Sequence, residues 1–154
     1  MTELAGPRPI LATLGWFAVY SVMLGAVSLA FFWVTGLEPN SGVGVTGAMI
    51  SAALAAQKYK EQAGEFPVKA DRWKLIGGSV LVSTLLSLAA VAFVLTVSGA
   101  ALIDALAASG IGELSMAASA GIIAAVFAVQ ILVLWFGYGP MARILNKPAQ
   151  RKPK

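Results

Sequence analysis

Three serines recur at four-residue intervals in an otherwise apolar stretch, at Ser79, Ser83 and Ser87. At about 3.6 residues per turn they share one face of a helix and predict a polar stripe. Each hydroxyl could bond back to its own helix, or the stripe could line a path for a neutral solute. Gln130 is the strongly polar side chain of another apolar stretch, and it predicts either a bond between helices or part of the same lining.

The chain has no histidine and no cysteine. That composition excludes serine–histidine–aspartate and cysteine–histidine catalysis, histidine-ligated haem, Cys/His zinc sites and iron–sulfur clusters. The acidic residues Glu61, Glu65 and Asp71 lie among lysines in one charged segment, which we expect to be a flexible loop without a usable acid–base set. We therefore expect no catalytic residue, no cofactor and no metal, and hence no enzyme.

The 154 residues are 58% hydrophobic and 12% charged, with a mean hydropathy of +0.82. Soluble domains carry about a quarter charged residues, so this composition indicates a membrane protein. Four apolar segments predict spanning helices, because about 20 residues at about 1.5 Å each cross a hydrocarbon core of about 30 Å. They are residues 10–34, 39–57, 75–97 and 115–136. We expect an all-α integral membrane four-helix bundle that forms a single domain over residues 1–154.

The second segment is the shortest, and a re-entrant or surface helix is its alternative. A signal peptide is the alternative for the first segment, but its apolar run exceeds the usual length of about 7–15 residues. Polar residues interrupt the pattern between spans three and four and predict a short interfacial helix. The run Gly137–Pro140 predicts the end of the last helix, or a kink in it, because proline lacks a backbone donor.

The eleven lysines and arginines occupy three places: Arg8, the loop 58–74 and the tail 141–154. With four spans all of them lie on one face, which the positive-inside rule makes cytoplasmic. We therefore expect a bacterial inner-membrane protein with both termini inside. Three spans would place the basic loop and the basic tail on opposite faces.

The basic face is expected to contact the lipid bilayer and its anionic headgroups, and no nucleic acid. Lys58 and Glu61 have the spacing of a helical ion pair. The loop that holds them is either solvated or a docking site for a cytoplasmic partner. Tryptophans are expected to anchor the spans at the membrane interfaces. They are Trp16, Trp33, Trp73 and Trp135.

Small residues recur at helical spacing in the second and fourth segments and permit close approach of helices. They are Gly44, Gly47, Ala48, Ser51, Ala52 and Ala55, followed by Ala117, Gly121 and Ala125. Packing inside the bundle is one interpretation, and a seam for another subunit or a second copy is the other.

The loop carries Gln57-Lys58-Tyr59, Gly64, Pro67, Lys69-Ala70 and Arg72-Trp73, preceded by Asn40-Ser41-Gly42. With Gly137-Tyr138-Gly139, this pattern resembles an uncharacterised family of small bacterial four-span inner-membrane proteins. The likeness covers roughly residues 36–90 and 137–139. The likeness implies the four-span architecture, but it implies no activity, because the family has none established.

Two functions follow from these patterns. The first is a non-catalytic accessory, assembly or stabilising subunit of a larger membrane complex, or a homo-oligomer. The second is a minimal oligomeric transporter or channel for a neutral or hydrophobic solute.

Overall fold

The computed structural model describes residues 9–36, 41–98 and 116–146, and in these ranges the chain is helical with short connections. Its long helices are α1 (Ile10–Thr35), α2 (Ser41–Ala63), α3 (Lys69–Ser98) and α5 (Met116–Phe136). The interfacial helix expected between spans three and four and the end of the basic tail lie outside the described residues. So does Arg8.

Within the described ranges, three stretches are long and apolar enough to cross a membrane. They are Ile10–Thr35, Lys69–Phe93 and Ala118–Leu145. Helix α2 is not among them, because its glycine, serine and threonine residues contribute little hydropathy and its last turns carry lysines. Long apolar helices with mostly exposed faces are typical of a membrane protein.

Two helices end on a glycine in the left-handed conformation. Gly36 (φ 66°) follows α1, and its N–H donates to the Phe32 carbonyl at 2.9 Å. Gly64 (φ 76°) follows α2 and donates to the Lys60 carbonyl at 2.8 Å. Glycine lacks the Cβ that disfavours this conformation, which explains why both helices end there.

The sequence predicted that the last helix either ends or kinks at Gly137–Pro140, and in the structure it continues beyond Phe136. A π-helical turn, η2 (Gly137–Met141), contains Pro140 and leads directly into α6 (Ala142–Leu145). The wider turn accommodates the ring of Pro140 and its missing N–H, so the helix is distorted rather than terminated.

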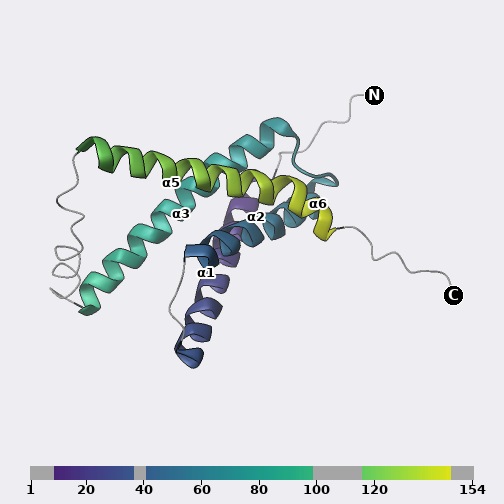
Figure 1. The fold of residues 1–154 in the computed structure, drawn as a ribbon. Helices are drawn as coiled ribbons and strands as arrows, with labels where there is room; N and C mark the ends of the chain where they lie inside the picture. Colours follow the sequence, from purple (N-terminus) through teal and green to yellow (C-terminus); the bar gives the residue numbers. More distant parts are fainter. Residues whose placement is uncertain (1–8, 37–40, 99–115, 147–154) are drawn as a thin grey trace, which may run out of the picture.

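One end of the molecule is densely packed. It joins the start of α1, the end of α2, the start of α3, and η2 with α6, so consecutive long helices run in opposite directions. Figure 1 shows the helices coming together near α6 and spreading apart towards the start of α5 and the end of α3. We call this region the packed end. Its buried hydrophobic residues are Phe17, Ala52, Ala53, Ala55, Ala56, Tyr59, Leu75, Ile76, Leu134, Tyr138 and Ala142.

The expected flexible loop at 58–74 is mostly helical. Only residues 64–68 lie outside α2 and α3. Tyr59 and Asp71 are buried, with exposed fractions of 2% and 0%. The interpretation of Asp71 as part of a solvated loop is therefore wrong: its place in the first turn of α3 turns the carboxylate into the packed end.

Candidate functional site: a cavity between the four long helices

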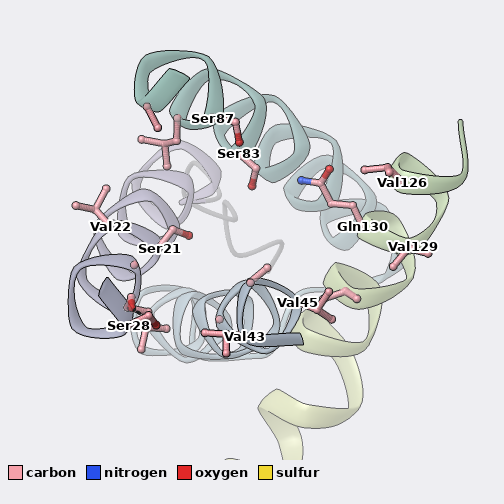
Figure 2. A pocket seen from close by; sticks show the side chains of 18 of the residues that line it. Ser21, Val22, Ser28, Val43, Val45, Ser83, Ser87, Val126, Val129 and Gln130 are labelled. Atoms are coloured by element: carbon pink, nitrogen blue, oxygen red, sulfur yellow. Dashed lines mark hydrogen bonds between the residues drawn. The ribbon is translucent and has the colours of Figure 1, made fainter. Parts of the chain in front are cut away.

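A partly open cavity of about 1020 Å³ lies between α1, α2, α3 and α5. Its walls are formed by segments 21–32, 43–48, 83–90 and 125–133. In each helix, this segment lies farther from the packed end than the buried residues do. Figure 2 looks into this space and shows side chains of all four helices around it. The lining is mostly valine, leucine, alanine and glycine, so the cavity suits an apolar occupant.

A few polar side chains interrupt the apolar lining. Ser83 and Ser87 come from α3 and Gln130 from α5, and they face the same space in Figure 2. The structure thus brings together three of the four side chains that the sequence marked as a polar lining. No hydrogen bond of these three side chains occurs within the described chain, so their polar atoms are available to an occupant.

Two further serines of α1 were missed by the sequence reasoning. Ser28 donates to the Leu24 carbonyl at 2.7 Å, which satisfies its hydroxyl within its own helix. Ser21 Oγ is shielded from solvent and has no hydrogen-bond partner in the described chain. The seven-residue spacing of these serines is two helical turns, which is the signal that would have placed them on one face.

Ser79 does not line the cavity. It is buried in the packed end, where its hydroxyl lies 2.7 Å from the hydroxyl of Tyr138. This bond joins α3 to η2 across 59 residues of sequence. One turn of α3 therefore separates a structural serine from the serines of the cavity, and spacing alone could not reveal this division.

The small residues of α2 divide in the same way. Ser51, Ala52 and Ala55 are buried in the packed end. The remaining members of the predicted rows on α2, Gly44, Gly47 and Ala48, line the cavity instead. On α5, Ala125 lines the cavity and Gly121 is exposed, while the side chain of Ala117 is outside the described part.

The packed end contains a second buried polar contact. Tyr59 Oη donates to Asp71 Oδ2 at 2.8 Å, which ties the end of α2 to the start of α3. Tyr59 follows Ala52 and Ala55 at helical spacing, so it continues the buried face of α2. The sequence reasoning missed this pair because it treated both residues as members of a loop.

Close backbone approach explains the glycines of η2. A Cβ on Gly137 would lie 2.7 Å from Ala52 Cβ and 2.8 Å from the Met49 carbonyl oxygen. A Cβ on Gly139 would lie 3.0 Å from Arg72 Nη1. The absence of a Cβ at Gly137 allows η2 to pack directly on α2. The absence of a Cβ at Gly139 leaves room for the guanidinium of Arg72.

The tryptophans lie at both ends of the helices. Trp16 stacks on Tyr20 with ring centroids 5.7 Å apart, and Lys58 Nζ lies 5.5 Å from the centre of its ring. Trp33 is 88% exposed near the far end of α1. Trp73 and Trp135 are exposed near the packed end, as is expected of side chains that contact lipid headgroups.

Lys58 also pairs with Glu61 at 2.6 Å, which confirms the ion pair expected from their spacing. The hydrogen bond to Glu61 raises the pKa of Lys58 above its usual value. The pair is exposed, so it contributes little to stability.

The chemistry available in the cavity is that of binding. Its lining residues in the described chain are apolar, hydroxyl or amide in character, and none of them is ionisable. Such a set can donate and accept hydrogen bonds, but it cannot exchange a proton near neutral pH.

No protein-family model matches the chain, and neither a curated protein nor a solved structure does. The resemblance carried by the loop residues therefore stays a prediction, and the functional argument depends on the cavity and the packed end.

Proposed function

We propose that the chain crosses a bacterial inner membrane four times as one helical domain, with the packed end and both termini at the cytoplasmic face. The basic residues Lys58, Arg72 and Arg143 all lie at the packed end, and the positive-inside rule favours the cytoplasm for that end. Helix α2 contacts α1 more extensively than any other pair of elements contact each other in the described chain, which supports counting it as a span. Because neighbouring helices cover its middle, α2 need not be as apolar as a lipid-exposed helix.

Thiol labelling tests this orientation, since a chain without cysteine can carry a single introduced thiol. Lys74→Cys and Asn146→Cys should react with a membrane-impermeant maleimide only after the cells are permeabilised. Thr35→Cys, at the exposed far end of α1, should react in intact cells. Labelling of Lys74→Cys and Asn146→Cys from opposite sides would refute four spans.

We further propose that the protein is a non-catalytic subunit whose cavity receives a transmembrane helix, either of a larger membrane complex or of a second copy. The observation that carries this proposal is the position of Gly44, Gly47 and Ala48, which line the cavity; in the described part of the chain, a Cβ at Gly44 or at Gly47 would meet nothing within 4 Å. Lipid chains do not require small residues on the surface they contact, whereas close helix–helix approach does.

The size of the cavity agrees with such an occupant. A helix about 10 Å in diameter that rises about 1.5 Å per residue fills about 1000 Å³ with roughly nine residues. The cavity, with a volume of about 1020 Å³, is of that order of size. Ser83, Ser87 and Gln130 would then bond to polar groups of the incoming helix, as polar side chains do between membrane helices.

Site-directed photo-crosslinking tests the role. Ala48→Cys, modified with benzophenone maleimide in native membranes, should form a protein adduct whose mass identifies either a second copy or a different chain. Leu132→Cys is the matched control, because Leu132 is 65% exposed on α5 and does not line the cavity. Adducts of equal yield at both positions, or adducts with lipid alone, would refute the proposed role.

A second candidate function is passage or binding of a neutral or hydrophobic solute, and the grouping of Ser83, Ser87 and Gln130 favours it. An apolar cavity with a few polar groups is typical of small-molecule sites. Flux or binding should then fall when Ser83→Ala and Ser87→Ala are combined in reconstituted vesicles. Unchanged flux together with a persistent Ala48→Cys adduct would refute the solute function and support only the subunit role.

A further inference from the structure

Arg72 occupies an unusual position at the packed end. Its guanidinium lies against Gly139, with Nη1 3.0 Å from the point where a Cβ would be. Its Nε is shielded from solvent and has no hydrogen-bond partner in the described chain. A buried N–H of a charged group without a partner is costly, so an acceptor is expected there.

A second guanidinium lies nearby. Arg143 follows Gly139 by four residues, which is about one turn, and it is close enough to Arg72 for their charges to interact. Neither Arg72 nor Arg143 forms an ion pair within the described residues. Two cations held close together are stabilised by an anion that binds both.

We infer that Arg72 and Arg143 bind the phosphate group of an anionic membrane lipid. Arginine binds phosphate oxygens through two parallel hydrogen bonds, which suits the unpaired Nε together with a terminal nitrogen. Arg72 is in the first turns of α3, a helix that can cross the membrane, and its exposed neighbour Trp73 is a residue typical of the headgroup region. Basic pockets between membrane helices on the cytoplasmic side bind lipid headgroups in the same way.

The site is independent of the cavity and goes beyond the proposed function. It requires that the packed end lies at a membrane surface and does not require a partner protein. If the unmodified protein binds no lipid while Ala48→Cys still forms its protein adduct, this inference alone is refuted; if it binds the lipid and Ala48→Cys forms no protein adduct, the subunit role alone is refuted.

Native mass spectrometry of the full chain with phosphatidylglycerol tests the inference. Arg72→Gln and Arg143→Gln should each weaken retention of the lipid by about tenfold. Lys74→Gln is the matched control, because Lys74 lies on α3 at the same level but two residues from Arg72 and thus on another face. Its effect should stay within about twofold. Arg143 is exposed, so Arg143→Gln keeps the test valid even if Arg72→Gln does not fold.

A second arm separates the sources of phosphate. The unmodified protein should retain phosphatidylglycerol in the presence of inorganic phosphate and should not bind inorganic phosphate alone. Binding of inorganic phosphate without the lipid would overturn the assignment to a lipid. Equal losses of lipid retention in Lys74→Gln and Arg143→Gln would overturn the site at Arg72 and Arg143, because they would indicate diffuse attraction of the lipid to a basic surface.

Discussion

The hydroxyl of Ser79 lies 2.7 Å from the hydroxyl of Tyr138, and both side chains are buried. The bond joins α3 to the π-helical turn at the point where the last helix is distorted by Pro140. The rings of Phe17 and Tyr138 also lie near one another, with centroids 6.4 Å apart. Tyr138 therefore links three helices of the packed end through one hydroxyl and one ring.

We expect Tyr138→Phe to destabilise the protein by about 0.6–1.7 kcal/mol, the range of hydrogen bonds between membrane helices. The substitution keeps the ring packed on Phe17 but leaves the buried Ser79 hydroxyl without its partner. Thermal unfolding in a mild detergent measures the change. Ser79→Ala completes a double-mutant cycle, and additive effects of the two substitutions would contradict a direct bond between them.

Gly137→Ala should destabilise the protein by about 1–3 kcal/mol, the usual range for overpacking. The added methyl would lie 2.8 Å from the Met49 carbonyl oxygen, a backbone atom that cannot move away by changing its rotamer. Gly77→Ala is the control, because a Cβ at Gly77 meets nothing within 4 Å. Equal melting temperatures for both variants would show that η2 and α2 are not in close contact.

Tyr59→Phe should destabilise the protein more than Tyr138→Phe does, although each removes one hydroxyl. The hydroxyl of Tyr59 donates to the carboxylate of Asp71, and hydrogen bonds to charged groups contribute about 1.5–3 kcal/mol. Asp71 is fully buried, so water cannot readily replace the lost donor. Thermal unfolding of both variants in the same detergent ranks them, and the opposite order would refute a stronger role for the Tyr59–Asp71 contact.

The helices of this protein could be read from the sequence because their signals are local. The uncharged run of α1, the glycine that ends α2 and the spacing of Lys58 and Glu61 each depend on a few neighbouring residues. Glycine in the left-handed conformation and charges one turn apart act through short-range sterics and electrostatics. These features therefore require no knowledge of which helices are neighbours.

The division between packed end and cavity could not be predicted, because it depends on how the helices diverge. Ser79 and Ser83 are one turn apart on the same face, yet only the first meets a neighbouring helix. The burial of Asp71 has the same origin, since it requires Tyr59 of another helix at bonding distance. Helix spacing fixes which residues share a face and leaves open what that face contacts.

The most direct test of the cavity fills it without disturbing the packed end. A Cβ at Gly47 meets nothing within 4 Å, and Gly47 lines the cavity, so Gly47→Leu should fit in the isolated protein. We expect its stability to change by less than about 1 kcal/mol while the protein adduct formed by Ala48→Cys falls by about tenfold, because a bulky side chain prevents close helix approach. Ala89→Leu is the control, since Ala89 is exposed on α3 and does not line the cavity. An adduct that survives Gly47→Leu would mean that the partner contacts another face, whereas loss of stability would mean that the helices close over the cavity.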